Sequence, residues 1–327
     1  MKVHLSPLSF LFSFLVMLIA TSSLSDAQVR STKFTVVIHG GAGTINESMP
    51  DSIKEEYYSS LRKALQIGKD ILANGGTSMD AVETVLRYFE EDPKFNAGIG
   101  AVYTSAGTHE LDASIMEGKD LSCGAVAGVE HIAHPISLAR LVMEKSPHVL
   151  LADGGAEEFA KKMGIELVAN SYFDTPERKR QLEEYMKQSK EGGHGTCGCV
   201  ALDEYGNLAA GTSTGGMTGK MPGRIGDSPL IGDGTYADNK TCAVSGTGWG
   251  EKFIKHAVAF NITVLMAYKG MSLKDATNEV IYNVLQPDDG GVIAVDKDGN
   301  YAMEFNTSGM FRGVATSDGT FEVKIWK

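Results

Sequence analysis

Residues 194–203, HGTCGCVALD, join a charged segment (175–193), which we expect to be mobile, to a hydrophobic pattern typical of a β-strand. A glycine directly before a threonine at such a junction has two interpretations. It can be an ordinary turn before a strand, or it can be a point of self-cleavage between Gly195 and Thr196. The dipeptide alone favours the turn, and the rest of the chain favours cleavage.

Cleavage at this bond would give Thr196 a free α-amine beside its own hydroxyl. An unperturbed α-amine has a pKa of about 7.7–8.0. It can therefore accept the proton of the hydroxyl at neutral pH and act as a general base. Thr196 would then supply both the nucleophile and the base for hydrolysis of an amide.

Composition places the chain among ordinary globular proteins. It has 327 residues, of which 43% are hydrophobic and 22% charged, enough for one large domain or two small ones. The net charge is −11, and the sequence contains no basic stripe. We therefore expect neither nucleic acid nor an anionic membrane surface as a partner.

The N-terminus has the pattern of a signal peptide. Residues 8–20 form an apolar run that is shorter than the roughly 20 residues a membrane-spanning helix needs. Ser25 and Ala27 then place small residues at the −3 and −1 positions of a cleavage site. We expect residues 1–27 to be removed and the protein to be exported, with no membrane attachment afterwards. A membrane anchor is the alternative.

Four cysteines are present, and export would permit disulfides. Their spacing matches neither a CxxC redox motif nor a zinc site. Cys197 and Cys199 would share one face of a strand, so Cys197 would point away from the face of its neighbour Thr196. We expect buried thiols that pack as small apolar groups, but the sequence leaves their disulfide state open. The set is Cys123, Cys197, Cys199 and Cys242.

Strands and helices occur in separate blocks, which favours an α+β fold over a doubly wound sheet. Two helix pairs and two blocks of strands predict a four-layer αββα sandwich. We predict helices at 53–73, 79–91, 136–144, 156–163, 251–268 and 273–285, and a short surface helix that opens at 175–177 before the glycine-rich break at 191–195. We predict strands at 34–39, 101–103, 110–116, 124–129, 197–203, 207–213, 241–245, 291–296, 301–305, 313–316 and 321–326.

Seven motifs then give the chain a family resemblance. They are HGGAG (39–43), FNAGIGAV (95–102), HELDASIM (109–116), GTCGCVALD (195–203), TSTGG (212–216), GRIGDSP (223–229) and FNTSGM (305–310). In this order they resemble the plant-type asparaginases, also called isoaspartyl peptidases, which are N-terminal nucleophile hydrolases. The resemblance extends from about residue 36 to the C-terminus. It implies self-cleavage into an α subunit (28–195) and a β subunit (196–327) that stay associated, and an (αβ)2 dimer.

The resemblance also implies catalytic roles. Thr196 matches the nucleophile, and Thr214 matches a threonine whose hydroxyl bonds the nucleophile's oxygen. Thr247, through its hydroxyl, and Gly248, through its N–H, match an oxyanion hole. Asn96 matches a residue that helps to hold the nucleophile.

Substrate and ion sites follow from the same resemblance. Arg224 matches a clamp for a substrate α-carboxylate and Asp227 one for its α-ammonium, with Gly250 beside them; a guanidinium fork suits a carboxylate. No cofactor is required. A structural Na⁺, or an activating K⁺, would bind backbone carbonyls. Those carbonyls belong to Phe89, Glu90, Asp92, Phe95, Ala97 and Ile99.

The implied activity is hydrolysis of β-aspartyl dipeptides and L-asparagine through a β-aspartyl-threonine ester. Two features depart from the family pattern, namely Cys197 in place of the usual valine and the export signal. Since glycosylasparaginases are secreted or lysosomal, that group remains an alternative. An exported amino-acid-binding protein is the non-enzymatic alternative, because it too could use an Arg/Asp pair.

Overall fold

Two β-sheets form the centre of the fold in the computed structural model, which describes residues 33–188 and 195–327. The larger sheet has eight strands in the order β12-β11-β1-β5-β6-β2-β3-β4, and the smaller has the order β10-β9-β8-β7. The larger sheet contains β1 (Thr35–Gly43), β2 (Leu111–Glu117), β3 (Cys123–Val129), β4 (Leu150–Ala152), β5 (Cys197–Leu202), β6 (Leu208–Thr214), β11 (Gly309–Thr316) and β12 (Phe321–Lys324). The smaller contains β7 (Thr235–Ala237), β8 (Cys242–Gly248), β9 (Gly290–Asp296) and β10 (Tyr301–Phe305).

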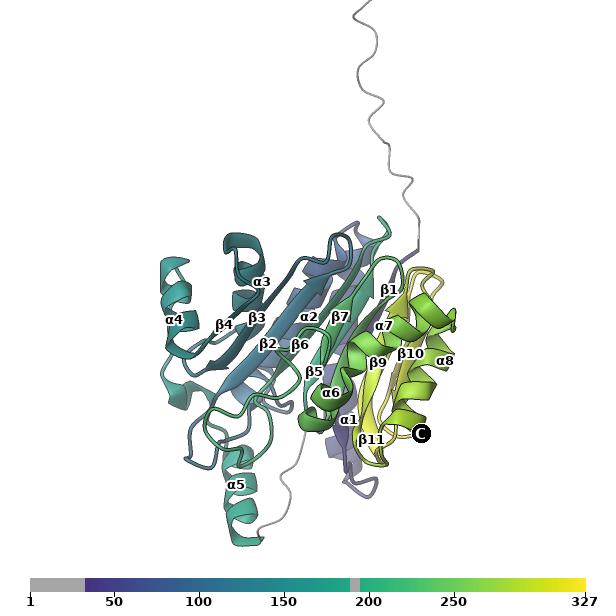
Figure 1. The fold of residues 1–327 in the computed structure, drawn as a ribbon. Helices are drawn as coiled ribbons and strands as arrows, with labels where there is room; N and C mark the ends of the chain where they lie inside the picture. Colours follow the sequence, from purple (N-terminus) through teal and green to yellow (C-terminus); the bar gives the residue numbers. More distant parts are fainter. Residues whose placement is uncertain (1–32, 189–194) are drawn as a thin grey trace, which may run out of the picture. The chain divides into compact units, whose positions relative to one another are not determined.

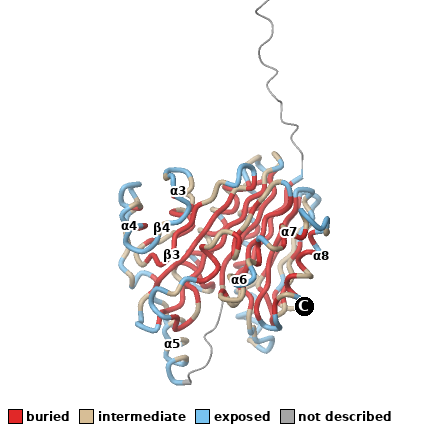
Figure 2. The backbone as a smooth tube through the Cα atoms, in the orientation of Figure 1, coloured by how far each residue is buried: buried red, intermediate tan, exposed pale blue. Residues whose placement is uncertain are grey.

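Helices cover the outer face of each sheet (Figure 1). The apolar side chains of α1 (Asp51–Ala73), α2 (Ser78–Glu91), α3 (Pro135–Lys145) and α4 (Asp153–Lys162) form one core with the larger sheet. Those of α6 (Gly250–His256), α7 (Val258–Lys269) and α8 (Leu273–Asn278) form another with the smaller sheet. A third core, which includes Val37, Val200 and Ile293, lies between the sheets. The predicted αββα sandwich is therefore confirmed, with buried strands inside and exposed helix faces outside (Figure 2).

Several predicted elements differ in detail. The expected strand at 101–103 is absent, and the short 3₁₀ helix Gly98–Gly100 precedes that segment. The helix expected at 251–268 divides into α6 and α7 at Ala257, which has a left-handed φ of 44°. The helix expected at 273–285 continues after α8 as the π-helix Glu279–Val284. The short strands β4 and β7 were missed because three residues give no periodicity.

The charged segment before the cleavage point contains the short surface helix that the sequence predicts at 175–177. Its first part forms α5 (Pro176–Gln188). Arg180 makes ion pairs with Glu177 and Glu184 on this helix, and pairs at this spacing favour a helix. Residues 189–194 and the predicted signal peptide (1–27) lie outside the described residues.

All four cysteines are free thiols in the structure. Cys197 and Cys199 are fully buried in the core beneath the helices of the larger sheet, as the strand alternation predicts. Within residues 33–188 and 195–327, the helices include none with the length and apolarity to cross a bilayer.

Candidate active site

Thr196 lies directly before β5 and is buried, with 6% of its surface exposed. Strand β5 forms an antiparallel hairpin with β6, in which Cys197 faces Ser213. This register places Thr214, the last residue of β6, beside Thr196. The Thr196 hydroxyl donates to Thr214 Oγ1 at 3.2 Å, so the structure joins the two threonines that the sequence paired.

The carbonyl oxygen of Gly195 accepts two hydrogen bonds. Asn96 Nδ2 donates to it at 2.6 Å and Thr214 Oγ1 at 3.0 Å. Asn96 is itself fixed, because its Oδ1 accepts from the Val102 amide at 2.9 Å and its Nδ2 also donates to the Gly216 carbonyl at 2.7 Å. Two fixed donors on one carbonyl are the arrangement that stabilises a developing oxyanion.

The HGGAG loop packs against the bond between Gly195 and Thr196. Strand β1 has a bulge between His39 and Gly41, and Gly41 has a φ of +116°. A Cβ at Gly41 would lie 3.2 Å from Gly195 Cα and 3.4 Å from the Thr196 nitrogen. Only glycine suits both this backbone conformation and this approach. The loop lines a cavity of about 640 Å³ that Asn96 and Gly195 also line.

Thr247 and Gly248 end strand β8. Thr247 is fully buried, and its Oγ1 accepts from the Ala42 amide of the HGGAG loop at 3.2 Å. This contact connects the expected oxyanion-hole threonine to the loop that packs on the nucleophile.

The two clamp residues have different environments. Both nitrogens at the fork of Arg224, Nε and Nη2, donate to the Glu251 carboxylate at 2.9 Å. Asp227 is buried, and its Oδ2 has no hydrogen-bond partner among the described residues. Burial raises the pKa of Asp227 to about 7, although the charge of Arg224 acts in the opposite direction. A buried carboxylate oxygen without a partner suits a cationic ligand.

Gly250 leaves space between these two side chains. A Cβ at Gly250 would lie 2.8 Å from Arg224 Nη2 and 2.8 Å from Asp227 Oδ1. Any larger residue would therefore occupy the region between the guanidinium and the carboxylate, where the charged ends of an amino acid would meet both.

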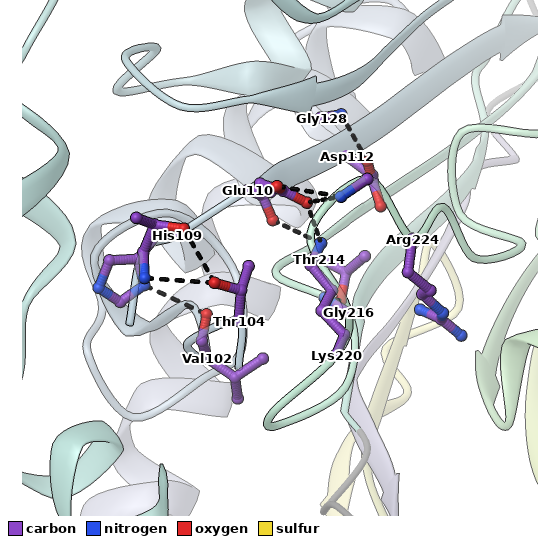
Figure 3. A network of polar contacts seen from close by, with 12 residues as sticks. Val102, Thr104, His109, Glu110, Asp112, Gly128, Thr214, Gly216, Lys220 and Arg224 are labelled. Atoms are coloured by element: carbon purple, nitrogen blue, oxygen red, sulfur yellow. Dashed lines mark hydrogen bonds and ion pairs between the residues drawn. The ribbon is translucent and has the colours of Figure 1, made fainter. Parts of the chain in front are cut away.

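Three charged residues near the site had no assigned role in the sequence analysis (Figure 3). Asp112 pairs in register with Thr214, and its Oδ1 accepts from the Gly128 amide at 2.8 Å. Lys220 Nζ donates to the Glu110 carbonyl at 2.8 Å. Burial raises the pKa of Asp112 and lowers that of Lys220. The HELDASIM motif contains Glu110 and Asp112, whereas no sequence signal distinguished Lys220.

The expected ion loop is a tight turn of backbone. A Cβ at Gly98 would lie 2.0 Å from the Glu90 carbonyl oxygen, and one at Gly100 would lie 1.9 Å from that of Phe95. The carbonyls of Phe89, Asp92, Phe95 and Ala97 each accept one backbone N–H. Since a carbonyl has two lone pairs, each keeps one for a cation. The alkali-ion site stays a prediction.

Three features together define an N-terminal nucleophile hydrolase. They are the four layers, the buried threonine at the start of a central strand, and the hydrogen-bond donors on the carbonyl that precedes it. The sequence profile of the family described as Asparaginase matches residues 32–325. The chain belongs to this family.

Curated relatives agree with this assignment. The "Isoaspartyl peptidase" of Salmonella typhimurium is 48% identical, over 86% of this chain and 94% of the relative. The "Isoaspartyl peptidase" of Escherichia coli is 47% identical, over 86% of this chain and 92% of the relative. The "Isoaspartyl peptidase/L-asparaginase" of Homo sapiens is 42% identical, over 84% of this chain and 91% of the relative.

Proposed function

We propose that this protein hydrolyses β-aspartyl dipeptides and L-asparagine after cleaving itself between Gly195 and Thr196. The observation that carries the proposal is the pairing of the Thr196 hydroxyl with Thr214, beside a clamp in which Gly250 keeps open the space between Arg224 and Asp227. Both substrate types carry a free α-amine and a free α-carboxylate, and in both the bond that breaks is on the side-chain carbonyl.

Maturation starts from the bonds around Gly195. The Thr196 hydroxyl attacks the Gly195 carbonyl carbon, while Asn96 and Thr214 stabilise the oxyanion. The C–N bond breaks, the Thr196 nitrogen takes the proton that the hydroxyl releases, and water hydrolyses the resulting ester. The products are an α subunit ending at Gly195 and a β subunit beginning with Thr196.

Turnover uses the amine released by this cleavage. The α-amine of Thr196 accepts the hydroxyl proton as Oγ1 attacks the substrate's side-chain carbonyl. The Thr247 hydroxyl and the Gly248 N–H stabilise the oxyanion. The leaving amine or ammonia takes the proton, and a β-aspartyl ester of Thr196 forms. Water activated by the same amine then releases aspartate and restores the hydroxyl.

The test is a comparison of β-aspartyl-leucine, L-asparagine and a GlcNAc-asparagine conjugate on processed enzyme. We expect the dipeptide to have the highest kcat/KM and the conjugate the lowest. A conjugate with the highest kcat/KM would instead identify a glycosylasparaginase. Failure to hydrolyse all three, with tight binding of a free amino acid, would favour a binding protein.

The remaining properties are part of the proposal. The two subunits stay associated because β1 and β5, which lie on opposite sides of the cleavage point, are paired in one sheet. We propose an (αβ)2 dimer, export directed by residues 1–27, and an alkali ion in the loop that runs from Phe89 to Ile99. Exchange of Na⁺ for tetramethylammonium should lower the Tm, and return of Na⁺ should restore it. An unchanged Tm would contradict the ion site.

A further inference from the structure

A row of polar side chains crosses the layer between the two sheets. On the larger sheet, His39 pairs in register with Gly198, Gly198 with Thr212, and Thr212 with Ser114. On the smaller sheet, Thr235 pairs with Ser245. Each of the five side chains in this row is fully buried. The apolar residues of the layer include Val37, Val200, Ala210 and Ile293.

Hydrogen bonds connect the row from end to end. His39 Nδ1 lies 3.0 Å from the Thr196 carbonyl oxygen and Nε2 lies 3.1 Å from Ser245 Oγ. Ser245 Oγ lies 2.7 Å from Thr212 Oγ1. Thr212 Oγ1 accepts from Thr235 at 2.5 Å, and Ser114 Oγ lies 2.8 Å from Thr235 Oγ1.

The far end of the row reaches the substrate clamp. Ser114 Oγ lies 2.5 Å from the carbonyl oxygen of Ser228, the residue after Asp227. The row therefore joins the backbone of the nucleophile to the backbone of the clamp. These two segments are more than 30 residues apart in the sequence, and the row connects them directly through the interior.

The direction of these bonds is determined. The Thr196 carbonyl only accepts, so His39 Nδ1 must donate to it. Burial lowers the pKa of His39 to about 3, against the opposing effect of the bond to Thr196, so the ring is neutral and Nε2 accepts from Ser245. Ser245 has then used its proton, so Thr212 donates to Ser245 and Thr235 donates to Thr212. Each hydroxyl has one proton, so the tautomer of His39 fixes the orientation of Ser245, Thr212 and Thr235, although Thr212 also has the Gly234 carbonyl as a second acceptor at 3.2 Å. Ser114 shares its single proton between the Ser228 carbonyl and Thr235 Oγ1, so the last link of the row is a three-centre hydrogen bond.

Gly198 makes the first link geometrically feasible. A Cβ at this position would lie 2.1 Å from His39 Nε2 and 2.2 Å from Ser245 Oγ. The second glycine of the GTCG sequence therefore leaves the space in which the histidine of the first sheet meets the serine of the second.

We propose that His39, Ser245, Thr212, Thr235 and Ser114 form a positioning network that holds the nucleophile Thr196 in register with the Asp227–Ser228 clamp. This inference rests on the proposed function. Because buried polar networks act cooperatively, breaking any link should disturb the same unit. None of the five residues touches the reacting atoms, so each acts through the segments that it holds.

The first experiment is a double-mutant cycle on processed enzyme. Thr212→Val keeps the shape and removes the central hydroxyl, and His39→Asn keeps a donor near the Nδ1 position but loses the link to Ser245. Each should lower kcat/KM by about fivefold, the value of a buried hydrogen bond. Because both break one network, the double variant should cost no more than the larger single effect. If the two residues had separate structural roles, their effects on kcat/KM would be fully additive in free energy. That result would overturn the proposal.

Two matched variants accompany the cycle. Thr277→Val removes another fully buried threonine hydroxyl, one that bonds the Leu273 carbonyl in α8, far from the row; it should leave kcat/KM unchanged. His39→Gln places its amide near the Nε2 position and loses the donor to Thr196. His39→Gln should therefore reduce kcat more than His39→Asn does. A larger loss of kcat in His39→Asn would contradict the proposed network.

The second experiment does not depend on catalysis. Nitrogen NMR of ¹⁵N-histidine-labelled protein should show a neutral Nδ1–H tautomer that disappears in His39→Asn. An Nε2–H tautomer or an imidazolium at neutral pH would overturn the proposal. Because this result concerns the ring alone, it stands even if none of the proposed substrates is hydrolysed.

Discussion

The side-chain nitrogen of Asn96 lies 2.6 Å from the carbonyl oxygen of Gly195, 99 positions later in the sequence. Thr214 donates to the same oxygen from the opposite strand of the nucleophile's hairpin at 3.0 Å. The uncleaved chain thus already holds its own scissile carbonyl between two donors, and the predictions below start from this geometry.

Asn96→Ala should slow self-cleavage by about 10²–10³-fold, the effect of removing one oxyanion donor. Thr214→Val removes the second donor with little change of shape and should also slow it. The measurement is the appearance of the two fragments on denaturing gels over time. Asn283→Ala, at an exposed amide bonded to Glu279 in the same helix, should cleave at the normal rate. Normal cleavage of both site variants would exclude this role.

Thr196→Ala should remain one inactive chain, because it lacks the attacking hydroxyl. The unaltered protein should give fragments corresponding to residues 28–195 and 196–327. Thr196→Ser keeps a hydroxyl and should retain part of both cleavage and hydrolysis. Mass spectrometry identifies the new N-terminus. Activity in an uncleaved Thr196→Ala protein would disprove the mechanism.

Arg224→Lys should reduce kcat/KM for L-asparagine by more than the tenfold that about 1.4 kcal/mol represents. The guanidinium can bind Glu251 through Nε and Nη2 and still present Nη1 and Nη2 to a substrate carboxylate, whereas lysine keeps the charge but cannot bind a carboxylate with two parallel hydrogen bonds. Steady-state kinetics measure the loss, and Arg180→Lys, on the exposed face of α5, serves as the control. If Arg224→Lys and Arg180→Lys had equal kcat/KM values, Arg224 would not be part of the clamp.

Activity should depend on the ionisation of Asp227, whose pKa burial raises to about 7. Only the carboxylate form binds an α-ammonium, so ionisation of Asp227 should contribute a rise in kcat/KM through about pH 7, followed by a second rise as the Thr196 α-amine, with an unperturbed pKa of about 7.7–8.0, loses its proton. The raised pKa also means that the folded protein holds a proton that the unfolded chain releases above its ordinary pKa of 3.8. The contribution of Asp227 to stability should therefore fall as pH rises from about 4 to about 7.

Asp227→Asn separates the two effects of ionisation. It should remove the part of the rise in kcat/KM near pH 7 and leave the part that the Thr196 α-amine causes at higher pH. Compared with the unaltered protein, it should be relatively more stable at pH 8 than at pH 5, because no buried charge forms. A pH–rate profile and thermal unfolding at both pH values test this, and an unchanged profile would assign the ionisation to another group.

Secreted protein should begin at Gln28, within one or two residues, if residues 1–27 are a signal peptide. N-terminal sequencing of the α subunit from the medium or periplasm tests this. An intact Met1 on protein recovered from the cytosol would refute export.

The sequence by itself determined the local chemistry and the order of the layers. Strand alternation placed Cys197 away from the face of Thr196. The family resemblance implied the bond between Thr214 and Thr196, and the local hairpin of residues 197–214 provides it. These predictions succeeded because both depend on residues that are close along the chain, where periodicity and turn chemistry fix the geometry. The helix that opens at 175–177 is confirmed for the same local reason, because ion pairs at helical spacing support it.

The tertiary structure alone decided which distant groups meet. His39 and Ser245 are 206 positions apart in the sequence. They bond only because the two sheets stack face to face and Gly198, which has no side chain, leaves room for the contact. Glu251 bonds the guanidinium of Arg224 only because α6 begins beside the turn that carries Arg224 and Asp227. Lys220 became a buried cation only through the fold of the GRIGDSP region around Glu110. Such contacts depend on how layers pack in space, which no local sequence pattern records.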